Sequence, residues 1–190
     1  MATLTIWSKW VPSKCNIFMW RAILDRLPSK RALHRRNIVV EDPMCSFCGE
    51  AEETTDHLFT ACTLASNVWH AISTWCKIPE IFAFSVFDLS KIHKHARVSR
   101  VFKAEVVKGL IVIACWKIWK ARNENIFQQS SSNARDIVEA IKSIGFLWFK
   151  HRQKRICIEW DDWRCFNLMH VIDCVGFLSL LETGGFLAGV

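Results

Sequence analysis

The sequence contains few of the residues that make tight turns. Its 190 residues include only 4 prolines and 7 glycines, and no tyrosine. So few turn formers argue against an all-β fold, which needs many turns, and they favour helices. The chain still has ample material for a core, because 51% of its residues are hydrophobic, among them 10 tryptophans and 13 phenylalanines.

Long uncharged apolar runs are also missing. The most apolar stretch spans residues 106–119, but Lys108 and Lys117 limit its uncharged part to residues 109–116. A helix needs about 20 apolar residues to cross a bilayer. We therefore expect no membrane span, and we interpret this stretch as a central core helix.

Several functional signatures are absent as well. The sequence has no phosphate-binding loop, nucleophile elbow or dinucleotide fingerprint, so we expect neither an enzyme nor a small-molecule substrate. The N-terminus lacks the basic and apolar regions of a secretory signal, and the 9 cysteines are an odd number. These features predict reduced thiols in an intracellular protein, with nucleus or cytoplasm undecided.

One group of cysteines does have a recognisable spacing. Cys45, Cys48, His57 and Cys62 form the pattern C-x2-C-x8-H-x4-C. Three thiols and one imidazole complete a tetrahedral ligand set for Zn²⁺ and leave no position for water, which is typical of a structural site. Gly49 suits the left-handed conformation that a turn after Cys48 often needs. The alternative is four unlinked side chains that bind nothing.

Apolar periodicity and capping residues predict a mainly α-helical fold. The expected helices span residues 15–24, 30–36, 64–75, 100–127 and 134–150, and Ser29, Ser99 and Asn133 are candidate N-caps. Residues 54–56 could cap a further helix that carries the last two metal ligands. Residues 38–40 could form a short strand or extended chain, so one short β hairpin at the metal turn is left open.

This pattern predicts a zinc-stapled helical module packed on long amphipathic helices. We place the zinc-binding domain at residues 1–76 and a helical C-terminal extension at residues 77–168. The apolar tail, residues 169–190, has an uncertain status.

Basic residues form two clusters in a chain of net charge +7 and pI near 9.0. The clusters are Lys30, Arg31, Arg35 and Arg36, and Lys150, Arg152, Lys154 and Arg155. With aromatic residues nearby, they are candidate contacts for RNA or DNA. The metal loop is acidic, however, so the first cluster could instead pack against it. The sequence leaves both interpretations open.

Other candidate sites are weaker. The pair Asp161–Asp162 lacks the further carboxylates that two-metal catalysis needs, so we expect a solvated acidic pair. His93 and His95 lie in a lysine-rich segment that is typical of a polar surface.

A longer set of residues carries a family resemblance. The set comprises Trp7, Trp10-Val11-Pro12, Ile17-Phe18-Met19-Trp20-Arg21, Arg26-Leu27-Pro28-Ser29-Lys30, Leu33, Arg35-Arg36, Cys45, Cys48-Gly49, Glu52-Glu53-Thr54, His57-Leu58-Phe59, Cys62 and Trp69. It resembles the zinc-binding domain of plant reverse transcriptases, which follows the polymerase in non-LTR (LINE-type) retroelements. Ile118-Trp119, Arg122-Asn123, Phe146-Leu147-Trp148, His151-Arg152, Trp160, Trp163 and Phe166 look like the sequence that often follows this domain.

The resemblance implies one zinc ion on the four residues named above, in a helical setting. It also implies a role in binding element RNA or target DNA beside a reverse transcriptase polymerase domain. That polymerase domain is absent from this sequence, so a label of RNA-directed DNA polymerase would be inherited from a parent element. The alternative function is a protein–protein interaction module with a purely structural zinc.

Overall fold

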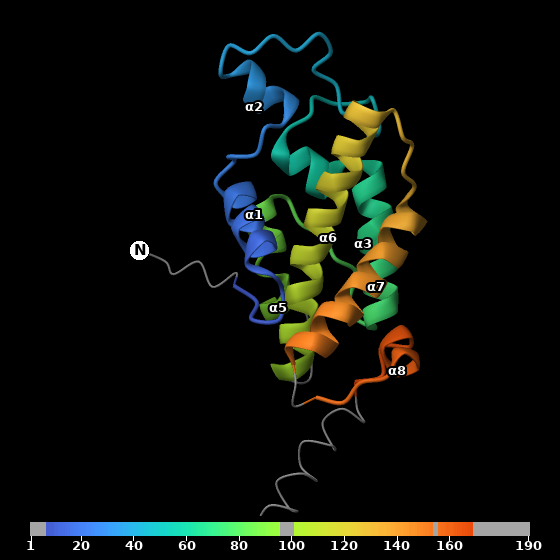
Figure 1. Ribbon diagram of the computed structural model, residues 1–190. Coiled ribbons are helices and arrows are strands. Elements are labelled where there is room, and N and C mark those ends of the chain that lie inside the picture. Colours follow the sequence, from blue (N-terminus) through green and yellow to red (C-terminus); the bar gives the residue numbers. More distant parts are fainter. Residues whose placement is uncertain (1–6, 96–100, 154–155, 169–190) are drawn as a thin grey trace, which may run out of the picture.

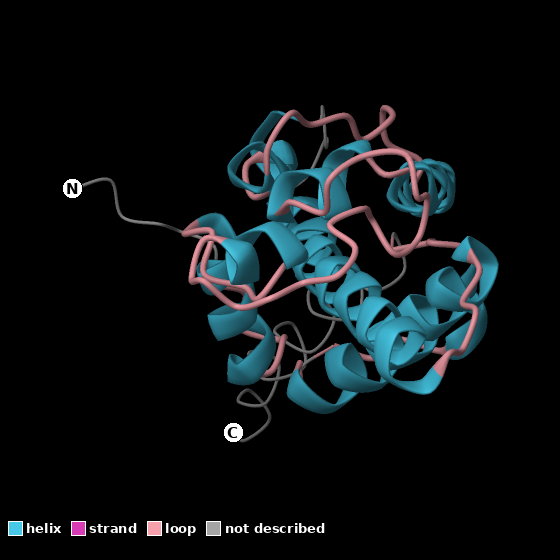
Figure 2. Cartoon of the chain, turned by 90° about the horizontal axis from the view of Figure 1, so that it is seen from above, coloured by secondary structure: helices cyan, strands magenta, loops and turns pink. Residues whose placement is uncertain are grey.

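The computed structural model describes residues 7–95, 101–153 and 156–168, and all regular elements in these residues are helices. In chain order they are α1 (Ser13–Ile23), α2 (Lys30–His34), the π-helix η1 (His57–Ala61), α3 (Thr63–Cys76), α4 (Val86–Leu89), α5 (Ile92–His95), α6 (Val101–Gln128), α7 (Ala134–Arg152) and α8 (Trp160–Arg164). Helix α6 runs through the middle of the molecule, and α1, α3, α5 and α7 pack around it (Figures 1 and 2).

The position of α6 follows from its sequence. Every residue from 106 to 115 is buried, because a helix that is apolar on all sides belongs in an interior. Lys108 is the one charged residue in this buried stretch. Its ammonium group has polar partners close by. Its Nζ donates to the Trp7 carbonyl oxygen at 2.8 Å and lies 3.5 Å from the Glu105 carboxylate. No helix in the described residues is long and apolar enough to cross a bilayer.

Trp10 joins the N-terminal segment to α6 and α7. Its fully buried ring donates from Nε1 to the Glu105 carbonyl oxygen at 3.2 Å and meets the Phe149 ring edge-on at 5.3 Å. Gly109 permits this approach, since a Cβ atom there would lie 2.1 Å from the Trp10 ring. The first described segment is therefore part of the main core.

Helix boundaries agree well with the capping signals. Ser29 Oγ accepts a hydrogen bond from the Ala32 amide, and Asn133 Oδ1 accepts one from the Asp136 amide. The expected helix over residues 100–127 is observed as α6. Its candidate cap, Ser99, lies outside the described residues.

The short hairpin that the sequence left open does not form in the described residues. Met44 and Glu52 make a single antiparallel bridge, and residues 38–40 are not a strand. Val39 is 90% exposed, because no neighbouring strand or core surface covers this run. The metal turn is thus closed by one bridge.

Segments 1–76 and 77–168 contribute to one hydrophobic cluster. Met19 and Ile72 from the first segment lie in the same cluster as Ile113 and Ile141 from the second. The domain boundary at residue 76 stays a prediction, and the predicted tail lies outside the described residues.

Candidate metal centre

The first two cysteines lie in a tight turn, which we call the knuckle (residues 43–53). The Cys45 amide donates to the Ala51 carbonyl oxygen at 2.7 Å, and the Gly49 amide donates to the Cys45 carbonyl oxygen at 2.8 Å. Gly49 has a φ of +67°, the left-handed conformation that the sequence predicts there. These bonds turn the chain so that Cys48 returns toward Cys45.

His57 and Cys62 come from the two ends of the π-helical turn η1. Thr54 Oγ1 accepts a hydrogen bond from the His57 amide at 2.9 Å, as expected of a capping residue. The Cys62 amide then donates to the His57 carbonyl oxygen at 2.8 Å. Residues five apart diverge by about 140° around an α-helix. A π-helical turn holds more residues than an α-helical turn, so it brings residues five apart closer to the same side of the helix. It therefore suits the spacing of His57 and Cys62.

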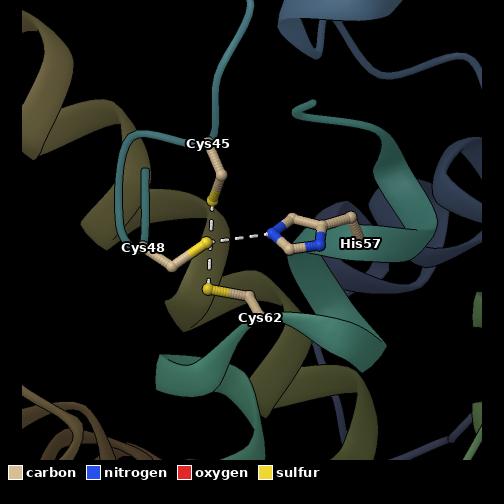
Figure 3. A group of neighbouring side chains, drawn as sticks. All are labelled: Cys45, Cys48, His57 and Cys62. Atoms are coloured by element: carbon tan, nitrogen blue, oxygen red, sulfur yellow. Dashed lines mark hydrogen bonds between the residues drawn. The ribbon is translucent and has the colours of Figure 1, made fainter. Parts of the chain in front are cut away.

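The four side chains meet at one point (Figure 3). Their ligand atoms all lie within 4.8 Å of one another. The Cys45 and Cys62 sulfurs are 3.9 Å apart, and the Cys48 sulfur is 3.3 Å from His57 Nε2. Tetrahedral zinc geometry requires about 3.8 Å between two sulfurs and about 3.5 Å between sulfur and nitrogen. The cluster is therefore consistent with one zinc site.

The backbone also favours negative sulfur in this cluster. The Cys45 sulfur faces the amides of Phe47 and Cys48, and the Cys62 sulfur faces the amides of Leu64 and Ala65 at the start of α3. A hydrogen bond from the Cys62 thiol lowers the pKa of Cys45 to about 5. The same contact, together with burial and the Cys45 charge, raises the pKa of Cys62. The surroundings of this buried pair thus favour negative charge on the Cys45 sulfur.

Residues 2–69 match the family model described as zinc-binding in reverse transcriptase. This segment is a zinc-binding domain of the reverse-transcriptase type. Neither the curated proteins nor the solved structures provide a match to the chain.

A buried ion pair connects this zinc-binding domain to α6. Glu53 is 0% exposed and Arg122 is 4% exposed, and Arg122 Nε donates to Glu53 Oε1 at 3.1 Å. Glu53 also accepts hydrogen bonds from the Lys30 amide at 3.0 Å and from Ser46 Oγ at 3.1 Å. Burial raises the pKa of Glu53, but the bonds and charge of Arg122 hold that pKa below its usual value. One carboxylate therefore joins α2, the knuckle and α6.

A second contact supports the knuckle. Asn125 Nδ2, also from α6, donates to the Ser46 carbonyl oxygen at 2.9 Å. The sequence placed Glu53 only in the acidic metal loop and assigned no role to Arg122 or Asn125. Glu53 lies in the first part of the family resemblance and Arg122 in the second. This was the only signal in the sequence that the two residues could be in contact.

The basic cluster at α2 packs against acidic side chains. Lys30 Nζ bonds to the Asp42 carboxylate at 3.2 Å and to the Met44 carbonyl oxygen at 2.7 Å, and its side chain is only 14% exposed. Two further ion pairs join Arg31 to Glu52 and Arg35 to Asp25. Three of the four cations in this cluster therefore have acidic partners, and the nucleic-acid contacts of the cluster stay a prediction.

The other predicted nucleic-acid contacts have fewer acidic neighbours among the described residues. Arg36 and Arg152 are exposed, and Lys150 lies 3.4 Å from the Glu159 carboxylate. Lys154 and Arg155 lie outside the described residues.

The weaker candidates remain separate from the zinc-binding domain. Asp161 is 85% exposed at the side chain and pairs with Arg164 at 3.3 Å, as expected of a solvated carboxylate, whereas Asp162 is half-buried. His93 is half-buried, and burial lowers its pKa. The cluster at Cys45 is the only metal-ligand grouping found within the described ranges.

Proposed function

We propose that Cys45, Cys48, His57 and Cys62 bind one structural Zn²⁺. The observation that carries this proposal is the convergence of four ligand atoms within 4.8 Å, in a segment of the reverse-transcriptase zinc-binding family. When bound, the ion would neutralise the thiolates and displace the protons of the thiols. Four protein ligands leave no open position, so we propose that the site has no catalytic role.

We further propose that the chain is a nucleic-acid-binding accessory module that acts beside a reverse transcriptase polymerase domain of a LINE-type plant retroelement. The support is the family of residues 2–69 together with the net charge of +7. A positive protein is attracted to the phosphate backbone whatever the base sequence. The binding experiment described below decides between RNA and DNA.

A protein–protein interaction module is the second candidate. Phe82 and Phe84 favour it, because they are 73% and 82% exposed and pack on each other with ring centroids 5.0 Å apart. Exposed aromatic pairs of this kind often mark protein contacts.

Binding of the zinc-loaded chain to labelled RNA and DNA at about 50 and about 200 mM salt separates the two candidates. For a nucleic-acid-binding module, we expect affinity to fall steeply between these concentrations, because each phosphate contact releases counterions. Absence of binding to every nucleic acid, with salt-insensitive binding to a polymerase domain, would favour the protein-interaction module.

A further inference from the structure

A groove of about 540 Å³ lies between α1 and α6, and Leu27, Pro28 and Leu33 also line it. Helix α1 contributes Lys14, Ile17 and Arg21 to one wall, and α6 contributes Trp116 and Phe127 to the other. None of these residues belongs to the candidate metal centre or to the two predicted basic clusters. The groove is comparable in volume to sites that hold a small organic ligand.

The α6 wall offers aromatic surface to a ligand. Phe127 is 77% exposed near the end of α6, although burial would be expected for so apolar a side chain. Trp116 is half-buried and is fixed edge-on against the Phe18 ring at 5.2 Å. Such rings can stack with nucleic-acid bases of any type.

The α1 wall carries exposed positive charge. Lys14 and Arg21 lie two turns apart on α1, about 10 Å along the axis. Lys14 Nζ lies 6.0 Å from the centre of the Trp116 ring, so cation and aromatic surface are adjacent. Among the described residues that line the groove, none is acidic. This distinguishes the groove from the α2 cluster, where carboxylates already engage the cations.

We infer that this groove binds single-stranded nucleic acid. Unpaired bases would stack on Trp116 and Phe127, while Lys14 and Arg21 would contact the phosphates. A duplex keeps its base faces inside the stack, so it cannot offer them to the aromatic wall. The inference rests on the proposed nucleic-acid function and adds a location and a preference for single strands.

The test pairs each groove variant with a matched control. Phe127→Ala removes an exposed ring from the groove, and Phe87→Ala removes an exposed ring of α4 that does not line it. Arg21→Gln removes a groove cation, and Arg135→Gln removes an exposed cation of α7 that does not line the groove. The variants and wild type would be measured with single strands and duplexes at several salt concentrations. Circular dichroism would check that each variant is folded.

We expect Phe127→Ala to weaken single-strand binding about 5- to 100-fold, as the loss of one stacked base predicts. Arg21→Gln should reduce the slope of log affinity against log salt by about 0.7, because one phosphate contact is lost. Both controls should bind like wild type. Photo-crosslinking of a halogenated single strand should label peptides that contain Trp116 or Phe127.

Three other outcomes are possible, and each contradicts either the proposed function or the groove inference. If wild type binds no nucleic acid, the proposed function and the groove inference both fail. If wild type binds single strands but the groove variants match their controls, only the groove inference fails. Loss of polymerase-domain binding in the groove variants, with unchanged nucleic-acid binding, would make the groove a protein interface and would overturn the inference.

Discussion

The knuckle and the middle of α6 are stabilised in different ways. Within residues 43–53 only Cys45 and Glu53 are buried, one a predicted metal ligand and the other half of an ion pair. Every residue from 106 to 115 is buried, and nearly all are apolar. The knuckle thus depends on a few polar contacts, whereas α6 depends on the removal of apolar surface from water. Substitutions in the knuckle should therefore act through lost metal and ion-pair contacts, and substitutions in α6 through altered packing.

The largest expected effect is the loss of zinc. Chelation, or Cys48→Ser, removes an interaction that can supply on the order of 10 kcal/mol, as much as the whole stability of many domains. We expect the knuckle and the N-terminal half to unfold while α6 and α7 retain part of their helicity. Metal analysis and circular dichroism would measure this, with the exposed Cys165→Ser as control. Unchanged zinc content and helicity in Cys48→Ser would contradict the structural zinc.

The buried ion pair comes next. Glu53→Gln leaves the Arg122 guanidinium buried without its charge partner, and we expect a loss of about 3–5 kcal/mol in the free energy of unfolding. Denaturant unfolding of the zinc-loaded protein would measure it. The exposed pair Arg31–Glu52 provides the control, since Glu52→Gln should cost less than about 1 kcal/mol. Equal effects of the two substitutions would contradict a special role for Glu53.

The same pair predicts a pH dependence. The pKa of Glu53 in the folded protein lies below its ordinary value of 4.5, so its ionisation stabilises the fold above that value. This stabilisation is lost as the pH falls from the ordinary carboxyl value through the lower folded value. Acid unfolding curves of wild type and Glu53→Gln should therefore differ most at neutral pH and converge in acid. A constant difference would rule out this source of stability.

A smaller effect is expected in the core. Gly109→Ala places a Cβ atom against the Trp10 ring, and overpacking of this kind costs about 1–3 kcal/mol. Thermal unfolding should show the loss while zinc content stays at one ion per chain. Combining the change with Trp10→Ala should give less than the sum of the two single effects, since the clash disappears. Strict additivity would mean that the ring does not cause the cost.

The smallest expected effect is in the knuckle backbone. Gly49→Ala meets no atom within 4 Å, so its cost arises only from the positive φ and should be about 1–2 kcal/mol. Gly49→Asn is the matched control, because asparagine tolerates the left-handed conformation better. Zinc affinity and thermal stability would be measured for both variants. An equal loss in the two variants would contradict the conformational explanation.

Local signals predicted much of this structure. Apolar periodicity located α1, α3, α6 and α7, and Ser29 and Asn133 marked helix starts, because these signals act within one or two turns. The offset of five between His57 and Cys62 was visible too, but the π-helical turn that it suits was not predicted. Single-turn π segments are rare, so a regular helix was the natural expectation.

The sequence by itself determined the metal-ligand spacing and most helix boundaries, since neighbouring residues decide both. Only the tertiary structure decided that Glu53 pairs with Arg122, 69 residues away, that Lys30, Arg31 and Arg35 face carboxylates, and that α1 and α6 enclose a groove. Such contacts depend on how whole helices pack against one another. No local pattern of charge or hydrophobicity specifies that arrangement, because the same exposed cation can face an acid or open solvent.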